Sequence, residues 1–435
     1  MEYKTTINSF YFYQYLFHST AIDNKYMDLI KYELDKRMYL CGNHFKANNE
    51  KYSSIKFYVY LFIKIIFVLL NKLLKRKSDR SVIISSAYSH FNDELRKLGY
   101  KVVFPELNIG NRHNYFGNIR ILLKYEYIKR GFRKENLNTI INDNFKGRIN
   151  DLRSDLIKYL ISHNVKALFV ANDMAFLEKM LIDIFKEIRK PSYVYLHGLP
   201  SRYNHTDDNR ADYLLVWGNK IKENYIRSGV RENKILSIGH SFYKNISKNK
   251  LRFEYSDILI ITQSIPGAPE DSEQLLLQDR GNILYYLWTI KDVLTKLKVT
   301  SVRFRPHPSE NPKWYLNNLD NKFFQLDKSP LYKSLQAATL VIGPTSTVFL
   351  EAIQNGVNYL VYEPCIQGRN LKNQTLFPPF DGLDPRIPVA KNQDDLYNYL
   401  VSQCPVDVSI YNELVGQPLD SNSIKNLPGI NEELR

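Results

Sequence analysis

Short apolar runs alternate with segments of helical periodicity from residue 81 onward. The first two runs, "SVIISSAYSHF" from Ser81 and "KVVFPEL" from Lys101, enclose the charged segment "NDELRKLGY", in which Gly99 stands where a helix would end. Four more runs lie at residues 166–173, 192–198, 213–219 and 234–240. Short unbroken apolar strands separated by helices are typical of a parallel sheet covered on both faces.

A second series of the same kind follows a polar, basic stretch after Gly239. The pattern predicts an α/β protein with two Rossmann-like domains, residues 79–245 and 255–405, which face each other across a ligand-binding cleft. Residues 406–435 are rich in Asn, Ser and Pro, and we expect them to form a surface tail. The apolar runs of the second series are residues 257–264, 301–307, 322–326, 339–345 and 358–364.

The N-terminal segment, residues 1–78, has helix-like patterns and few turn signals, so we expect a helical extension. Within it, an apolar run from Phe57 to Leu70 is interrupted by Lys64 and followed by a cluster of Lys and Arg residues up to position 77. This run is shorter than the ~20 apolar residues that a bilayer span needs. Residues 55–77 therefore predict an interfacial helix on an anionic membrane surface, with a helix buried against the domain as the alternative.

Composition narrows the choice of partners. The formal net charge of +15 favours an anionic partner, but the sequence has no nucleic-acid-binding motif, so we expect no nucleic acid. The three cysteines have neither metal-ligand nor disulfide spacing. The first residues lack the pattern of a secretory signal, which predicts a cytoplasmic protein, peripheral on the inner face of the plasma membrane.

A histidine locked between two prolines ends the second strand of the later series. In "RFRPHPSE", Arg305 precedes Pro306, His307 and Pro308. The prolines restrict the backbone and remove two N–H groups, which would aim the imidazole rigidly at the strand end. A histidine there can donate a hydrogen bond to a phosphate oxygen and stabilise charge on a leaving group. The alternative is a histidine that only caps a turn.

Three hydroxyl residues follow another strand of the same series. The strand in "TLVIGPTSTVFLEAIQNG" stops at Gly343-Pro344, and Thr345, Ser346 and Thr347 then begin a helix. Hydroxyls and free N–H groups at such a place favour an anion, although a plain N-cap would use the same residues. Glu351, one turn later, could accept hydrogen bonds from ribose hydroxyls, or be a solvated helix charge.

Candidate bases lie at the strand ends of the earlier series. Asp173 ends the strand in "FVANDMAF" and would face the cleft as a general base toward a sugar hydroxyl, although Asp is also a common helix N-cap. His197, in "YLHGLP", is a second candidate. The acidic pair in "HTDDN", residues 205–209, has no third ligand nearby, so it predicts a solvated turn, and we expect no metal site.

With these motifs, the chain resembles the GT-B glycosyltransferases that make bacterial surface polysaccharides, most of all the sialyltransferases, polysialyltransferases and Kdo-type transferases. These carry a His-Pro motif and a later Ser/Thr motif, matched here by His307-Pro308 and Thr345–Thr347. The resemblance covers residues 160–365. The related CDP-glycerol polymerases share an Arg-x-His-Pro segment and the strand ends "LHG", "VWG" and "IGH", matched by residues 305–308, 196–198, 216–218 and 238–240.

The resemblance implies a metal-independent glycosyltransferase that needs no cofactor and moves sialic acid or a similar sugar from a CMP-sugar to a capsule or lipooligosaccharide acceptor. It implies that His307 and Asp173 take part in catalysis. Gly343-Pro344 stands where the polymerases carry Asp, which argues against glycerol phosphate transfer, and "FLEA" also occurs in UDP-sugar enzymes. The residues implied for donor binding are Arg305, His307, Pro308, Thr345, Ser346, Thr347 and Glu351.

Four alternatives stay open beside the sialyltransferase hypothesis. The first two are a UDP-sugar-dependent GT-B transferase and a CDP-glycerol-type glycerophosphotransferase. A non-hydrolysing UDP-sugar 2-epimerase shares the architecture, but it would need dense acidic and histidine motifs that are not evident in the sequence. A membrane-docked assembly protein without chemistry would bind no nucleotide, and His307→Ala would then change nothing.

Overall fold

The computed structural model divides the chain into two compact units. One consists of residues 1–197, 205–215 and 420–435, and the other of residues 198–204 and 216–419. Statements about structure below concern the residues that it describes, namely 24–43, 54–74, 81–108, 110, 113–196, 198–200, 203, 210–246, 250–263, 277–308, 310–371 and 375–430.

The first sheet has the strand order β2-β1-β3-β4-β5-β6, and the order reverses between β1 and β3. The pairs that join β2 through β5 are parallel, with Ile84 of β1 opposite Val103 of β2 and Leu168 of β3. Ligands of open α/β sheets bind at such a reversal, outside the carboxyl ends of the strands. The strands are β1 (Val82–Ser85), β2 (Lys101–Val103), β3 (Val165–Val170), β4 (Ser192–Tyr195), β5 (Tyr213–Val216) and β6 (Ile235–Ser237).

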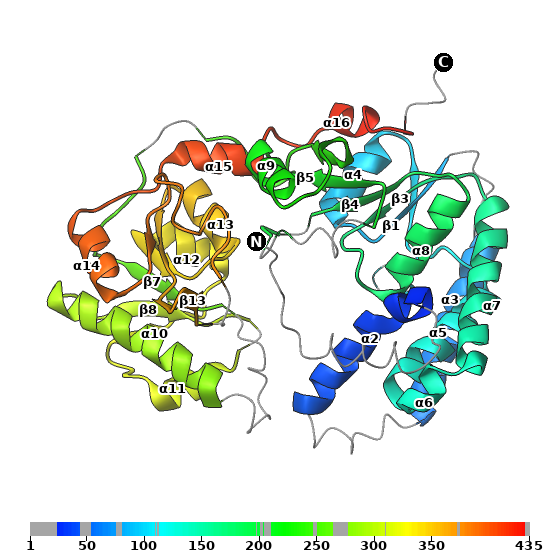
Figure 1. The fold of residues 1–435 in the computed structure, drawn as a ribbon, viewed down its shortest axis with the longest axis horizontal. Coiled ribbons are helices and arrows are strands. Elements are labelled where there is room, and N and C mark those ends of the chain that lie inside the picture. The colour runs from blue at the N-terminus through cyan, green and yellow to red at the C-terminus, as the bar shows by residue number, and fades with distance from the viewer. Residues whose placement is uncertain are drawn as a thin grey trace. The chain divides into compact units, whose positions relative to one another are not determined.

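Helices connect and cover this sheet (Figure 1). The N-terminal helices α2 and α3 both pack on α5, α2 also packs on α8, and α16 near the C-terminus packs on α4. The predicted helical N-terminal extension is therefore confirmed where it is described. The helices are α2 (Asn24–Asn43), α3 (Ser54–Leu74), α4 (Ser89–Lys97), α5 (Ile119–Lys134), α6 (Leu137–Ile140), α7 (Asp143–Ile161), α8 (Phe176–Glu187), α9 (Asn219–Arg227) and α16 (Ser421–Lys425), with a 3-10 turn at Glu232–Lys234.

The second sheet has the order β14-β11-β10-β7-β8-β9 and is parallel throughout. Numbered along the chain, this is the order 6-5-4-1-2-3 of the dinucleotide-binding fold, which reverses between β7 and β10. The strands are β7 (Ile258–Ile261), β8 (Val302–Arg305), β9 (Phe324–Leu326), β10 (Leu340–Gly343), β11 (Asn358–Tyr362) and β14 (Val389–Ala390); a separate hairpin pairs β12 (Cys365–Ile366) with β13 (Arg369–Asn370).

Helices cover both faces of this second sheet (Figure 1). On one face, Leu287 and Ile290 of α10 and Leu396 of α14 join a continuous apolar core with the strands. On the other face, the ring of Phe349 from α13 lies edge-on to Tyr359 of β11. These helices are α10 (Leu277–Lys296), α11 (Pro312–Asn318), α12 (Leu331–Ala337), α13 (Val348–Gln354), α14 (Gln393–Val401) and α15 (Val408–Val415).

The predicted fold class, α/β with two Rossmann-like domains, is confirmed. Every predicted apolar run of both series contains a strand. The end of the chain differs from the expected surface tail, because residues after 405 form α15 and α16. Ile410 and Leu414 of α15 are fully buried, so this segment belongs to the core despite its polar composition.

Candidate functional site

A buried carboxylate holds the loop that carries His307. The backbone N–H of His307 donates to Glu310 Oε2 at 2.9 Å and lies 3.1 Å from Thr262 Oγ1. Glu310 is 7% exposed and also accepts hydrogen bonds from the hydroxyls of Thr262 and Tyr315, the latter at 2.9 Å. The His-Pro loop is thus anchored to β7 and α11 through one side chain.

Glu310 changes the chemistry of its neighbour. Burial, and then the charge and hydrogen bonding of Glu310, raise the pKa of Tyr315, so the phenol stays protonated and donates. Sequence reasoning missed Glu310, although a glutamate three residues after the histidine in "HPSE" was a usable signal. The prolines restrict the loop, but Glu310 is what bonds it in place.

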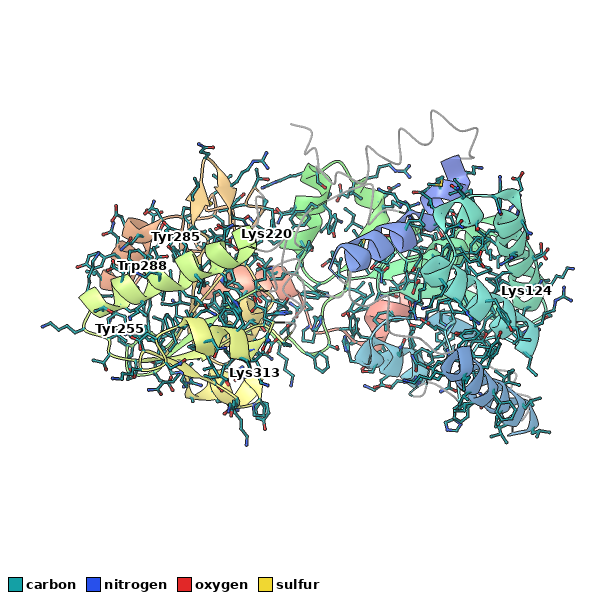
Figure 2. All side chains as sticks on the ribbon, turned by 90° about the horizontal axis from the view of Figure 1, so that it is seen from below. Lys124, Lys220, Tyr255, Tyr285, Trp288 and Lys313 are labelled. Carbon is teal, nitrogen blue, oxygen red and sulfur yellow. The ribbon has the colours of Figure 1, made fainter. Side chains whose placement is uncertain are left out.

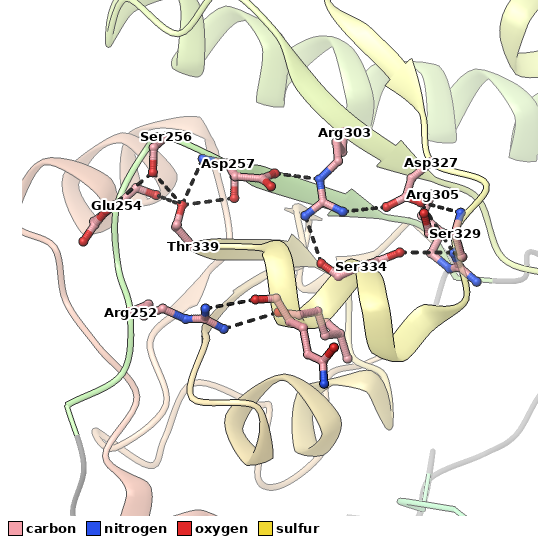
Figure 3. A network of polar contacts seen from close by, with 12 residues as sticks. Arg252, Glu254, Ser256, Asp257, Arg303, Arg305, Asp327, Ser329, Ser334 and Thr339 are labelled. Carbon is pink, nitrogen blue, oxygen red and sulfur yellow. Dashed lines mark hydrogen bonds and ion pairs between the residues drawn. The ribbon is translucent and has the colours of Figure 1, made fainter.

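Arg305, the last residue of β8, lies in an ion-pair network (Figure 3). Its guanidinium donates to the carbonyl of Ser329, and its Nη1 lies 3.9 Å from Asp327 Oδ1. Arg303, two residues earlier on the same face of β8, donates to Asp327 Oδ2 at 2.7 Å and to Asp257 Oδ1 at 2.6 Å. These contacts of Arg305 join β8 to the chain after β9, while its predicted role in donor binding stays a prediction.

The hydroxyl triplet follows β10 in a tight turn. A Cβ on Gly343 would lie 2.3 Å from the hydroxyl of Tyr359 and 2.4 Å from Ile261 Cγ1, so only glycine fits there. The backbone N–H of Thr345 donates to Glu363 Oε1 at 2.7 Å. Glu363, 4% exposed at the end of β11, supports this turn as Glu310 supports the His-Pro loop.

The three hydroxyls have different partners. Ser346 Oγ accepts a hydrogen bond from the backbone N–H of Val348 at 3.2 Å, and Thr347, the N-cap of α13, caps no N–H with its side chain. The hydroxyl of Thr345 is buried without a hydrogen-bond partner among the described residues. A Cβ on Gly198 would lie 3.5 Å from Thr347 Oγ1, so the glycine of the predicted "LHG" motif lies beside the triplet.

The strand order brings the two motifs to one edge of the sheet. β7 pairs with β8 on one side and with β10 on the other. His307 after β8 and Thr345–Thr347 after β10 therefore flank the end of β7, where Thr262 lies. This is the point where the strand order reverses, the usual ligand position of the fold.

Glu351 lies one turn into α13 and is partly buried. Burial raises its pKa, which separates it from an ordinary solvated helix charge. The charge of Glu351 is also one of the groups that raise the pKa of Tyr243, after burial of that phenol.

Asp173, the predicted base, is fully buried after β3. Its Oδ2 accepts a hydrogen bond from the backbone N–H of Arg210 at 2.8 Å, and the Arg210 guanidinium pairs with Asp28 at 2.6 Å. Asp173 thus supports the chain before β5. The second base candidate, His197, and the "HTDDN" loop lie outside the described residues. No cluster of three or more metal-ligating side chains occurs in the described part of the chain.

A cavity of about 430 Å³ opens at the carboxyl edge of the first sheet, beside the strand-order reversal. Ser86 after β1, Glu106 after β2 and Glu178 in the first turn of α8 contribute polar groups to its wall. Burial raises the pKa of Glu178 to about 7; its own backbone N–H and Lys129 oppose this rise, and the charges of Glu106 and Glu33 add to it. Nothing in the local sequence pattern of α8 indicated this group.

Three comparisons place the chain among known proteins. Neither a family model nor a curated protein matches it. Solved structures resemble it at low identity. A UDP-N-acetylglucosamine 2-epimerase from Listeria monocytogenes has a TM-score of 0.45 and 12% identity, and the match covers 80% of this chain and 96% of that one. The UDP-GlcNAc 2-epimerase of Methanocaldococcus jannaschii, in complex with UDP-GlcNAc and UDP, has a TM-score of 0.43 and 15% identity, with coverages of 79% and 97%. Anabaena Alr3699/HepE in complex with UDP has a TM-score of 0.42 and 12% identity, with coverages of 82% and 99%. With TM-scores below 0.5, the architecture is assigned here from the chain's own strand order.

Proposed function

We propose that the protein is a nucleotide-sugar-dependent glycosyltransferase. The observation that carries the proposal is the meeting of His307 and the triplet Thr345–Thr347 around β7, where the order of the second sheet reverses. Dinucleotides and nucleotides bind at this point of the fold. A histidine and several hydroxyls there supply hydrogen-bond donors for a diphosphate or phosphate without a metal ion.

The roles follow from the environment of each group. The His307 imidazole donates to the phosphate that leaves, and Glu310 and the two flanking prolines keep it aimed. The hydroxyl of Thr345 is buried and has no partner among the described residues, so a phosphate oxygen would satisfy it. Ser346 and Thr347 add further donors, and Glu351 accepts from the ribose hydroxyls.

The proton acceptor in this proposal is Glu178. A base must reach the hydroxyl that it deprotonates, and Asp173 is fully buried. Glu178 lines an open cavity and has a pKa of about 7, close to the value at which a general base works best near neutral pH. The acceptor hydroxyl would then lie in the cavity beside Ser86.

The donor nucleotide decides between the sialyltransferase hypothesis, which requires CMP, and its UDP-sugar alternative. We expect the melting temperature of the purified protein to rise with one of CMP, CDP, UDP, GDP and ADP, and His307→Ala to lose that rise. A cytidine-selective shift supports a CMP- or CDP-linked donor, and a uridine-selective shift supports a UDP-sugar.

The control is His163→Ala, which removes an exposed histidine of the first unit, after α7, and should keep the full shift. If no nucleotide raises the melting temperature, the proposal fails and the non-catalytic assembly protein remains. If a UDP-sugar turns over without any acceptor, the reaction is epimerisation rather than transfer.

The role of Glu178 predicts a pH dependence. The carboxylate is the active form, so transfer should rise with pH to a plateau above about pH 7, and Glu178→Gln should lower the rate about 10²–10⁴-fold. The titratable groups that interact with Glu178 include Glu106, Glu33, Lys129, Tyr32 and Tyr125. Asp173→Asn should leave the midpoint of the profile in place.

A stability measurement tests the same pKa without any substrate. The folded-state pKa of Glu178 lies above its ordinary value of 4.5, so the folded protein binds the proton more tightly than the unfolded chain does. Stability should therefore fall as pH rises from about 4.5 to about 7, and Glu178→Gln should flatten that slope. An equal slope in the variant would assign the titration to another group.

A further inference from the structure

Helix α3 turns a continuous apolar face outward. Phe62 is 63% exposed, Ile55 72% and Leu73 82%. Between Tyr58 and Leu70, every exposed side chain of the helix is aromatic or aliphatic. The exposed apolar residues are Ile55, Tyr58, Val59, Tyr60, Phe62, Ile63, Ile66, Leu69, Leu70 and Leu73.

The inward stripe of α3 is the more polar one. The buried positions with described side chains are Leu61, Lys64, Val68 and Asn71. Lys64 Nζ lies 2.6 Å from Glu126 Oε1 of α5, and the two side chains are only 6% and 8% exposed. A surface helix of a soluble domain has the opposite arrangement, with its apolar stripe inward. The arrangement differs from the alternative of a helix buried against the domain, because most of the apolar surface of α3 points away from the protein.

The segment that contains the apolar face carries charges of one sign. Residues 54–77 contain six Lys and Arg residues and no Asp or Glu. Among the described side chains of α3, Lys64 is buried against the carboxylate of Glu126, whereas Lys56 is exposed. The guanidinium of Arg130 stacks over the ring of Phe57, 4.6 Å from its centroid, next to the exposed Tyr58. Arg133 and Lys134 at the end of α5 are also exposed.

These observations select one occupant. A second copy of the chain on this face would bring two cationic helices together, and like charges repel. An anionic bilayer matches both features, since acyl chains accept the apolar face and lipid phosphates attract the cations. No helix in the described part of the chain is long and apolar enough to cross a bilayer.

We propose that the outer face of α3 inserts into the boundary between headgroups and acyl chains of an anionic membrane, with the helix axis parallel to the surface. The Lys64–Glu126 pair fastens the helix to α5, so membrane binding leaves the rest of the first unit folded. This proposal does not depend on the nucleotide chemistry of the second sheet.

Vesicle flotation with the full-length protein tests the proposal. We expect binding to vesicles of phosphatidylcholine mixed with phosphatidylglycerol, and at least about tenfold weaker binding to phosphatidylcholine alone or at high salt. The double variant Phe62→Asp/Ile66→Asp should lose the binding, because it puts two charges into the inserted face.

The matched control is Trp288→Asp on α10. Trp288 is 59% exposed, beside Tyr285 on the outer side of that helix (Figure 2), and its replacement should leave vesicle binding unchanged. Thermal melts of all variants report folding. Unchanged vesicle binding of the α3 variant would overturn the proposal. A wild-type protein that binds no vesicles but forms a dimer, which the α3 variant does not form, would also overturn it. Absence of both effects would mean that another segment of this chain covers the face, and the proposal would also fall.

Discussion

Replacing Arg303 with methionine should lower the free energy of unfolding by about 3–5 kcal/mol, the cost of leaving a buried charge without its partner. Arg303 donates to Asp327, whose side chain is only 2% exposed, to Asp257, and to the carbonyl of Ser334 at 2.9 Å (Figure 3). These bonds join β7, β8, the segment after β9, and α12. Urea unfolding of the variant and the wild type measures the difference.

The control for Arg303 is an exposed pair in the same unit. Lys291 and Asp320 lie 2.7 Å apart with side chains 36% and 42% exposed, so Lys291→Met should cost about 1 kcal/mol or less. If both variants lose the same small amount of unfolding free energy, other partners stabilise the Asp327 carboxylate and the Arg303 network contributes little to stability.

Acid should reduce the effect of the Arg303 variant. Burial alone would raise the pKa of Asp327, but hydrogen bonds from Ser334 and Ser329 and the charge of Arg303 outweigh it and lower the pKa below 3.8. A depressed carboxylate pKa stabilises the fold above the unfolded-state value, and this stabilisation disappears as pH falls through the folded-state value. The difference in free energy of unfolding between the wild type and the Arg303 variant should therefore become smaller below about pH 4.

Replacing Glu310 with glutamine should weaken nucleotide binding about 10- to 100-fold, although residue 310 does not belong to the proposed phosphate contacts. The amide of glutamine presents one acceptor and one donor, whereas Glu310 accepts from His307 N–H, from Thr262 and from Tyr315. One buried donor loses its acceptor, at a cost of about 1–3 kcal/mol. Among the elements that Glu310 bonds together, the His-Pro loop is the part that can move, so the loop should shift. Calorimetric titration with the nucleotide selected above measures the affinity.

Tyr315→Phe is the matched control for Glu310. It removes one hydrogen bond from the same carboxylate but leaves the bond to His307, so it should cost about 1 kcal/mol of stability with nearly unchanged affinity. Hydrogen exchange of the His307 amide gives a readout without ligand, and it should be faster only in the Glu310 variant. Equal affinities of wild type and Glu310→Gln would show that the prolines alone position His307.

Most of the second sheet, and the edge at which the proposed ligand site lies, could be predicted from local patterns. β8 ends at Arg305 before Pro306, and β10 ends at Gly343 before Pro344, because proline has no N–H to donate to the ladder. The carboxyl ends of parallel strands share one edge, so His307 and Thr345 could be assigned to one region without any distance information.

The bonding partners of the buried carboxylates could not be predicted. Glu310 was indicated by its place three residues after His307, but the groups that it, Glu363 and the first-unit residue Glu178 contact lie on other elements. Glu363 bonds the N–H of a residue 18 positions earlier, and the pKa of Glu178 depends on burial and on Glu106 and Glu33. Burial of a carboxylate is a property of the packed molecule rather than of its neighbours along the chain.

The sequence by itself determined the approximate positions of the strands, the α/β class and which polar residues follow the strand ends, because periodicity and chain breakers act over a few residues. Tertiary structure decided which buried carboxylates hold the loops and which side of α3 faces out. The apolar run around Lys64 defines a helix. Which face of that helix packs on the protein depends on Glu126, 62 positions away, because its bond with Lys64 holds the Lys64 side inward. Only folding brings such distant charges within bonding distance, and hydropathy along the chain contains no information about that encounter.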